Sequence, residues 1–156
     1  MGRRKRRRSK MKVHLVGKPV MTVHRRIIKK DKLVYLLVAP KPAKYPNGKS
    51  RILYVGTTSK GVKRIAGSAA HRAQEILESW GLRQMDVHIV SCKARQGLQS
   101  WGLLEDAILA QFRTRYFSLP RFNKQGQKLW FNSKLKKLFK LETIDSVLSE
   151  FDSTSR

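Results

Sequence analysis

Residues 52–64 read ILYVGTTSKGVKR, and they contain the change from strand to helix on which the expected fold depends. The aromatic and β-branched residues of 51–57 favour a strand. Thr58 or Ser59 can cap the helix that follows, because apolar residues then recur at helical spacing over 62–80. The sequence therefore predicts a strand that leads directly into a long helix.

Further strands are expected on the N-terminal side of this unit. Residues 13–16 and 20–28 are short β-branched stretches separated by a Gly-Lys-Pro turn, which predicts a hairpin. Residues 33–39 are apolar nearly throughout, as a central strand would be, and are expected to pair with 51–57. Three prolines lie between these two strands, and the Pro-Asn-Gly segment at 46–48 predicts an exposed loop.

The second half of the chain contains one more strand among helices. Residues 85–92 alternate sufficiently for a strand, and 100–116 have helical spacing behind a serine that can cap them. A loop is expected over 119–127, and 133–140 with 143–151 predict one broken or two short amphipathic helices. This order predicts an α+β fold, with helices flanking a small central sheet that is antiparallel or mixed.

The charge of the chain points to a polyanionic partner. It has 35 Lys and Arg against 10 Asp and Glu, a formal charge of +25 over 156 residues. Nucleic acid fits this balance best, because basic residues that neutralise its phosphates release counterions. The resulting affinity does not depend on the base sequence. An acidic membrane surface is a weaker alternative, and no apolar run is long enough to span a bilayer. A charged N-terminus without an apolar segment indicates a protein that is not secreted.

Glu105 stands in an unusual position. In the helix expected over 100–116, Trp101, Leu104, Ile108 and Phe112 share one face, and Glu105 falls among them. A carboxylate held against a core is costly unless it is paired or binds a cation. A metal ion at a nuclease site is the explanation favoured here, and an internal Lys or Arg partner is the alternative.

Several of these features together resemble the GIY-YIG nuclease family. The resemblance covers about residues 33–126 and depends on Leu33-Val34-Tyr35, Tyr54-Val55-Gly56, Arg64, Glu105 and Asn123, in that order and on those elements. The first tripeptide lacks the glycine of the family pattern, and the proline-rich insertion lengthens the connection to the second.

The resemblance implies hydrolysis of a phosphodiester bond with one divalent cation, Mg²⁺ or Mn²⁺. Glu105 would hold the metal, Arg64 would clamp the charge on the phosphoryl group, and Tyr54 would act as general base. Tyr35 would orient the attacking water by hydrogen bonding. A tyrosine has a pKa of about 10, so the role given to Tyr54 requires cationic charge nearby. Few carboxylates are available near Glu105, which favours one metal ion over two.

The remaining candidates have support or binding roles. Asn123 would support the site through hydrogen bonds, with an ordinary turn role as the alternative. His71 lies seven residues after Arg64 and returns to the same helix face, so it is a candidate catalytic residue that would contact phosphate or assist proton transfer, with a surface histidine in a basic groove as the alternative. The nucleic-acid-binding residues are expected to be basic side chains of the N-terminal arm and the first long helix: Arg3, Arg4, Lys5, Arg6, Arg7, Arg8, Lys60, Lys63 and Arg72.

The chain is thus expected to have four parts. Residues 1–12, with eight basic residues, are a disordered arm, and 13–30 form a hairpin extension. Residues 31–127 are the nuclease-like core, and 128–156 are a helical extension.

The leading hypothesis is a metal-dependent endonuclease acting on DNA, with RNA as a further substrate class, in a bacterial or phage-infected cytoplasm or in a nucleus. The alternative is a non-catalytic DNA- or RNA-binding protein on the same scaffold. The sequence leaves a monomer and a homodimer both open.

Overall fold

The computed structural model describes residues 29–125 and 129–152 of the chain. The arm expected over 1–12, with its six arginine and lysine candidates from Arg3 to Arg8, lies outside the described residues. So does nearly all of the hairpin expected over 13–30.

The described residues form an α+β fold around a three-stranded antiparallel sheet. Its strands are β1 (Leu33–Tyr45), β2 (Gly48–Thr58) and β3 (Asp86–Val90), in the order β2-β1-β3. The predicted fold class is confirmed, and the sheet is antiparallel throughout. The first seven residues of β1 are all buried, as expected for a strand with a neighbour on each side.

Most of the proline-rich segment after Ala39 belongs to β1, so the prediction that this segment is a loop is wrong. The register between β1 and β2 shifts between Val38 and Ala43, where the two prolines of the Pro-Lys-Pro segment interrupt the ladder. Proline lacks the N–H that a ladder needs, and a bulge tolerates that loss. The guanidinium of Arg51 donates a 3.0 Å hydrogen bond to the carbonyl of Ala39 there. The exposed turn is therefore reduced to Pro46 and Asn47.

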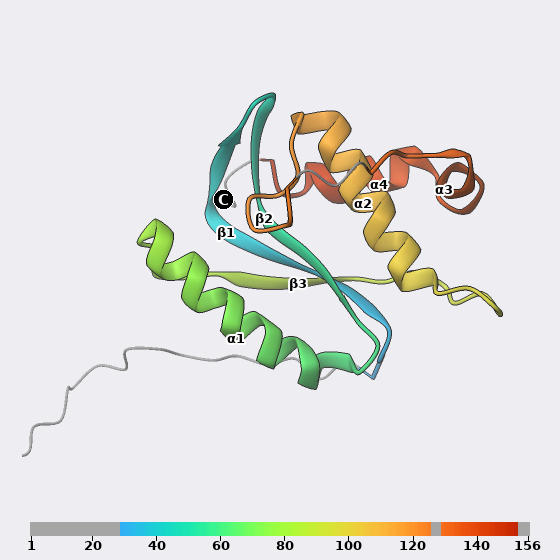
Figure 1. Cartoon of the computed structure of the whole chain (residues 1–156), viewed down its shortest axis with the longest axis horizontal. Helices are drawn as coiled ribbons and strands as arrows, with labels where there is room; N and C mark the ends of the chain where they lie inside the picture. The colour runs from blue at the N-terminus through green and yellow to red at the C-terminus, as the bar shows by residue number, and fades with distance from the viewer. Residues whose placement is uncertain (1–28, 126–128, 153–156) are drawn as a thin grey trace, which may run out of the picture.

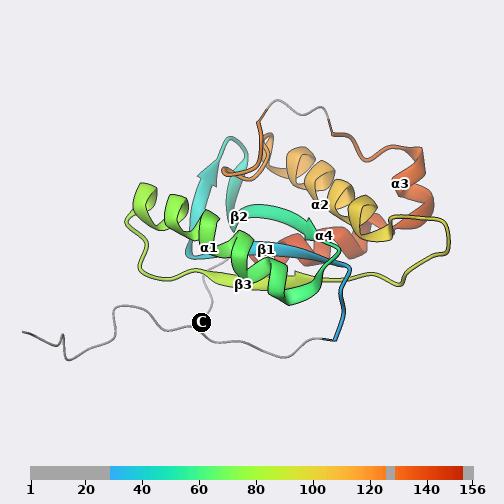
Figure 2. The same cartoon turned by 60° about the horizontal axis from the view of Figure 1, so that its bottom comes forward.

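Four helices pack around this sheet in the described residues. They are α1 (Gly61–Trp80), α2 (Ser100–Tyr116), α3 (Ser133–Leu138) and α4 (Leu141–Ser149). In Figure 1, α1 lies at the lower left and α2 at the upper right of the β1–β2 ribbon, and Figure 2 shows α4 beside α2. The serine and threonine caps expected for α1 and α2 are wrong, since neither helix has a side-chain cap.

The start of α1 is joined to the start of β1. The N–H of Gly61 donates a 2.8 Å hydrogen bond to the carbonyl of Asp31. Gly61 has a φ of +67°, and a Cβ there would lie 3.0 Å from the Asp31 carboxylate. Glycine suits this position because it adopts positive φ freely and leaves room for the approach of the chain.

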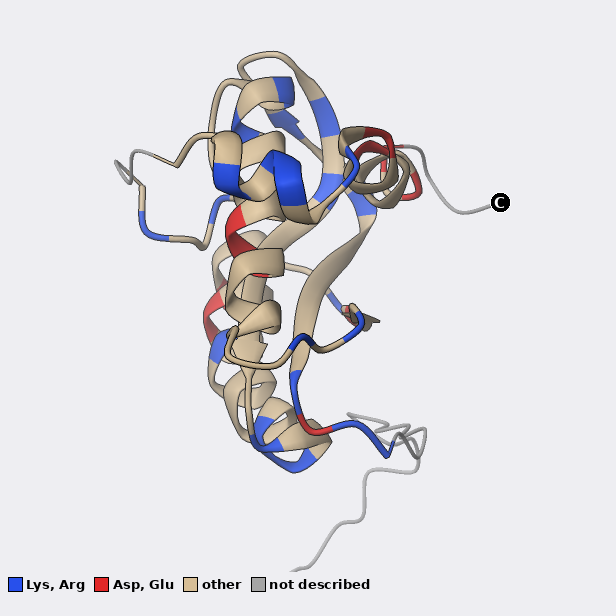
Figure 3. Ribbon diagram, turned by 90° about the vertical axis from the view of Figure 1, so that its right-hand side faces the viewer, with Lys and Arg blue, Asp and Glu red and all other residues tan. Residues whose placement is uncertain are grey.

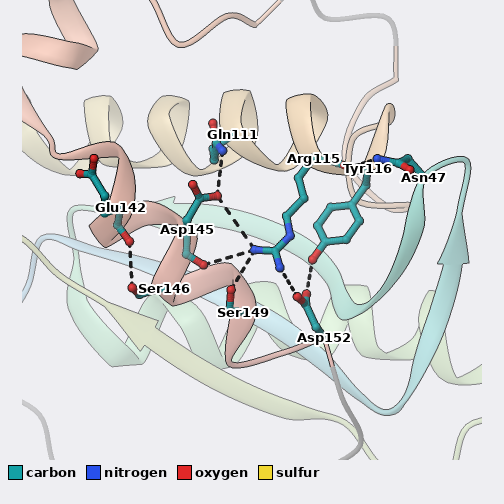
Figure 4. A network of polar contacts seen from close by, with 9 residues as sticks. All are labelled: Asn47, Gln111, Arg115, Tyr116, Glu142, Asp145, Ser146, Ser149 and Asp152. Atoms are coloured by element: carbon teal, nitrogen blue, oxygen red, sulfur yellow. Dashed lines mark hydrogen bonds and ion pairs between the residues drawn. The ribbon is translucent and has the colours of Figure 1, made fainter.

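A polar network joins α2 to α4 (Figure 4). Arg115 donates to the hydroxyl of Ser149 at 2.9 Å and forms an ion pair with Asp152, which also accepts a hydrogen bond from Tyr116. Gln111, which is buried, donates to Asp145 at 2.8 Å. These bonds hold the C-terminal half of α2 against α4 and the residues that follow it. They therefore help to fix the orientation of α2, whose N-terminal half carries Glu105.

The edge of β2 that faces away from β1 is covered by later segments. The N–H of Arg51 donates to the carbonyl of Phe151 at 2.7 Å, and the N–H of Phe122 donates to the carbonyl of Leu53 at 3.0 Å. Covering an edge strand satisfies its free polar groups and blocks pairing with another chain.

Basic residues occur on most elements of the described chain but not on β3 or α4, and acidic residues gather in a few stretches, including α4 (Figure 3). Among the described residues, no helix has the length and apolar content that crossing a membrane requires.

Candidate active site

Tyr35 and Tyr54 form a pair on one face of the sheet. Tyr35 is opposite Gly56 and Tyr54 is opposite Leu37, so the two phenol rings lie on the same face of neighbouring strands. Their ring centroids are 5.9 Å apart and the rings are tilted by 45°. The structure therefore places the two candidate tyrosines side by side.

Gly56 makes the close approach of the two rings possible. A Cβ at position 56 would lie 2.7 Å from Cζ and Oη of Tyr35 and 2.7 Å from Cε1 of Tyr54. Such distances are inside van der Waals contact, so any side chain at this position would push the rings apart. The glycine of the second tripeptide is required here for space.

Tyr35 is enclosed and protonated. Its side chain is only 4% exposed, and burial is the main reason why its pKa is raised to about 12. The nearby phenol of Tyr54 and the carboxylate of Glu105 raise this pKa further, while a hydrogen bond with Ser68 opposes the shift. Tyr35 is thus a hydrogen-bonding phenol at neutral pH.

Glu105 lies at the junction of α2 and the end of β2. Its side chain is half-buried, in agreement with its place in the apolar stripe, and Oε2 accepts a 3.2 Å hydrogen bond from the hydroxyl of Thr57. Burial raises the pKa of this carboxyl, the Thr57 bond lowers it, and neighbouring Asp106 raises it slightly. Among the described residues, no Lys or Arg lies within ion-pair distance of Glu105.

A shallow depression of about 400 Å³ opens beside Glu105. Asp106 and Lys134, the latter from α3, also line it. Burial raises the pKa of Asp106, while the charge of Lys134 lowers it. The remaining lining residues are Gly97, Leu98, Gln99, Gly102 and Leu103.

The donor set around Glu105 fits a cation that brings most of its own ligands. Residues 29–125 and 129–152 contain no group of three or more His, Cys, Asp or Glu side chains able to hold a metal. Mg²⁺ commonly uses one or two protein carboxylates and completes its shell with water and phosphate oxygens. A half-buried carboxylate that has no cationic partner among the described residues and lies at an open depression suits that mode of binding.

The arginine next to the tyrosines is Arg72 and not Arg64. The guanidinium of Arg72 lies 5.1 Å from the ring centroid of Tyr54 and forms a 2.8 Å ion pair with Glu75. Its pKa is raised chiefly by that bond to Glu75 and further by Tyr54. Arg64 is exposed, and it has no ion pair within the described chain.

Helical spacing relates these α1 residues to one another. Arg64, Ser68 and Arg72 are four residues apart and follow one row along the helix. Since Ser68 contacts Tyr35 and Arg72 contacts Tyr54, Arg64 extends the same row one turn beyond the tyrosines. His71 is exposed on this side of α1 without a described contact to either tyrosine.

Asn123 has a structural role at the edge of β2. Its Oδ1 accepts a 2.9 Å hydrogen bond from the N–H of Val55, and its Nδ2 donates a 2.8 Å bond to the carbonyl of the same residue. The side-chain amide therefore continues the sheet between Tyr54 and Gly56. The N–H of Asn123 also donates a 2.9 Å bond to the carbonyl of Pro120, so the residue both closes a turn and bonds to β2 through its side chain.

Three further lysines lie near the site, and one of them was missed by sequence reasoning. Lys60 precedes α1 and Lys63 lies in its first turn, both exposed as expected of phosphate-binding residues. Lys32 was not expected, but its amine lies 4.7 Å from the ring centroid of Trp101, one helical turn before Glu105. A cation on an indole ring is a long-range contact that no local spacing indicates.

No family model, curated protein or solved structure matches the chain. The assignment of the site therefore depends on its residues and their geometry alone.

Proposed function

We propose that this protein is a metal-dependent endonuclease of the GIY-YIG type that hydrolyses phosphodiester bonds in DNA. One observation carries the proposal: the half-buried carboxylate of Glu105, held by Thr57, stands at the sheet end that bears the Tyr35–Tyr54 pair. Tyr35, Tyr54 and Glu105 come from β1, β2 and α2, so three separate elements meet at this point. The formal charge of +25 supplies the affinity for a polyanionic substrate.

Each side chain of the site is assigned a role that its chemistry allows. Tyr35 donates hydrogen bonds, since its pKa of about 12 keeps the phenol protonated. Tyr54 is assigned the role of general base, because its ring lies between Tyr35 and the guanidinium of Arg72. Arg64 and Lys63 lie on the adjoining surface of α1, where a phosphate backbone would be bound.

Glu105 would hold a single divalent cation, Mg²⁺ or Mn²⁺. Such an ion polarises a scissile phosphate and stabilises a leaving oxygen. Thr57 fixes the rotamer of the carboxylate, leaving Oε1 directed away from that hydrogen bond.

The proposal is tested with duplex, branched and single-stranded DNA, and with RNA, incubated with and without Mg²⁺ or Mn²⁺. We expect cleavage only in the presence of the ion, and loss of cleavage with retained binding in the Glu105→Gln variant. A matched control is Asp106→Asn on the same turn, which should retain most activity. Full cleavage by Glu105→Gln, or equal cleavage in chelator, would contradict the proposal.

A non-catalytic nucleic-acid-binding protein is the second candidate. It is favoured by the low exposure of Tyr35, since a 4% exposed phenol can also be a sheet residue. This candidate predicts steeply salt-dependent binding of DNA or RNA with no cleavage under any ionic condition.

A further inference from the structure

Two large apolar side chains are more exposed than any others in the described residues. Phe117, immediately after α2, is 69% exposed, and Trp130, on the segment leading to α3, is 63% exposed. Large aromatic rings stabilise a fold when they are buried, so neither ring contributes much to the core in this position. Their exposure calls for a partner outside the described fold.

Phe117 also has an unusual backbone conformation. Its φ is 58°, which makes it the one non-glycine residue with positive φ among residues 29–125 and 129–152. It ends α2 in the left-handed conformation, where its N–H bonds to the carbonyl of Arg113 at 2.9 Å. Glycine or asparagine is the usual choice there, because a bulky side chain is strained. The chain keeps a phenyl ring at a place where the fold itself favours glycine.

Arg113 lies against the ring of Trp130, and its carbonyl accepts a hydrogen bond from the backbone N–H of Phe117. Its guanidinium lies 5.2 Å from the ring centroid of Trp130, and Phe117 follows one helical turn later. Lys124, seven residues after Phe117, is exposed, whereas Arg115 is paired with Asp152 and Arg121 lies against the ring of Trp80. Exposed aromatic rings interleaved with arginine are the elements that proteins use to stack unpaired nucleotide bases while they neutralise phosphates.

We infer that Phe117, Trp130 and Arg113 form a stacking platform for the unpaired bases of a single-stranded nucleic acid. The occupant is indicated by charge complementarity, since a chain of +25 that exposes aromatic rings among arginines attracts polyanions with flat apolar groups. Every base has a ring face, so the platform recognises single-strandedness and not sequence.

The platform also indicates which kind of nucleic acid would be the substrate, an inference that rests on the proposed function. Phe117 is 12 residues beyond Glu105 along one helix, which places it about 18 Å away along the axis, or about five stacked nucleotides. A substrate that reached both sites would be branched or partly unpaired, with single-stranded bases about five nucleotides from the cleaved bond.

Binding is measured first, in chelator, so that cleavage has no bearing on the result. The probes are a labelled oligodeoxythymidine, an abasic oligomer of the same length, and a duplex. We expect Trp130→Ala and Phe117→Gly each to weaken binding of the oligodeoxythymidine by roughly fivefold to hundredfold, the loss typical of one stacked base. Binding of the abasic oligomer and of the duplex should change less than twofold, because the phosphate contacts remain.

The variants are chosen to leave the fold intact. Glycine suits the left-handed backbone of residue 117, and Trp130→Phe and Phe117→Tyr should restore most of the affinity for the oligodeoxythymidine. Leu141→Ala, at another exposed apolar residue, is the control and should change none of the three affinities. Equal loss of affinity for all three probes, or none, would overturn the inference. Conversion of a dimer to a monomer by Trp130→Ala at unchanged affinity would assign the surface to a second copy of the chain instead.

Cleavage is measured separately with Mg²⁺ on branched DNA. If the wild-type chain cuts nothing but the binding differences hold, the platform stands and the proposed nuclease activity fails. If branched DNA is cut equally well by Trp130→Ala, the platform has no part in substrate choice.

Discussion

The hydroxyl of Thr57 donates a 3.2 Å hydrogen bond to Oε2 of Glu105, and this bond joins the end of β2 to the first turns of α2. It brings a carboxylate from the second half of the chain to the strand that carries Tyr54. Because no other hydrogen-bond donor or cation of the described residues holds Glu105, its orientation depends on this one hydroxyl.

Thr57→Val removes the hydroxyl with almost no change of volume. We expect about a tenfold to hundredfold loss of cleavage at low Mg²⁺, since residues that orient a metal ligand typically contribute this much. Thr57→Ser should retain activity. The measurement is the Mg²⁺ dependence of the cleavage rate, and an identical dependence in Thr57→Val and wild type would contradict this role.

The protonation of Glu105 predicts opposite effects on stability and activity. Burial raises its pKa above the ordinary value of about 4.3, so folding disfavours the charged form. The contribution of this group to stability is complete below the unfolded value and is lost as the pH rises through the folded one. Glu105→Gln should therefore raise the melting temperature at neutral pH in metal-free buffer, with a gain that shrinks as the pH falls towards 4.

The same shift sets the acid limit of activity. If the carboxylate must be ionised to hold a cation, cleavage should fall with decreasing pH sooner than it would for an ordinary glutamate. Mg²⁺ should raise the melting temperature of the wild-type protein and leave that of Glu105→Gln unchanged. A lower melting temperature of the variant at neutral pH would show that Glu105 stabilises the fold in its charged form.

Gly56→Ala tests the packing of the tyrosine pair. The added Cβ would meet both rings at 2.7 Å, so the rings must move, and we expect a destabilisation of about 1–3 kcal/mol together with a severe loss of cleavage. Gly67→Ala on α1 is the matched control, because a Cβ there meets nothing within 4 Å. It should stabilise the helix by about 0.5–1 kcal/mol, since alanine is the better helix former. Chemical denaturation and cleavage rates provide both readouts.

The sequence predicted those parts of the fold and site that depend on local pattern. Periodicity located α1 and α2, because their apolar faces recur at helical spacing over several turns. The burial of Glu105 followed from the same periodicity. Prolines indicated a break in the ladder at Pro40 and Pro42, but sequence could not distinguish a loop from a bulge within a longer hairpin.

Contacts between segments that are distant in the sequence could not be predicted from local sequence patterns. Arg72 is one of 35 basic residues, and its position over Tyr54 depends on how α1 crosses the sheet. Thr57 is the last residue of the strand expected over 51–57, and its bond to Glu105 depends on the placement of α2. The i, i+4 row from Arg64 through Ser68 was the one available signal for Arg72.

Asn123→Ala should loosen the strand that carries Tyr54. It removes both hydrogen bonds to the backbone of Val55, and leaving these half-buried groups unsatisfied costs about 1–3 kcal/mol. Hydrogen exchange at the Val55 amide should become faster, because Oδ1 of Asn123 is its acceptor. Asn123→Asp keeps that acceptor and loses the donor, so it should protect the amide better than alanine does. Unchanged exchange in Asn123→Ala would contradict the assignment.

The two arginines of α1 should differ in what they contribute. Arg64 is exposed, so Arg64→Gln should leave the melting temperature unchanged and reduce cleavage about 10²- to 10³-fold if its guanidinium stabilises the phosphoryl charge. Arg72→Gln removes the cation on the Tyr54 ring and the ion pair with Glu75, so a smaller loss of cleavage, about tenfold, should accompany a slight destabilisation. Lys63→Gln, next to Arg64, is the control for charge alone and should weaken binding without a large effect on the single-turnover rate. If Arg64→Gln cleaves normally while Arg72→Gln loses the larger factor, the phosphoryl clamp is Arg72, which already lies against Tyr54.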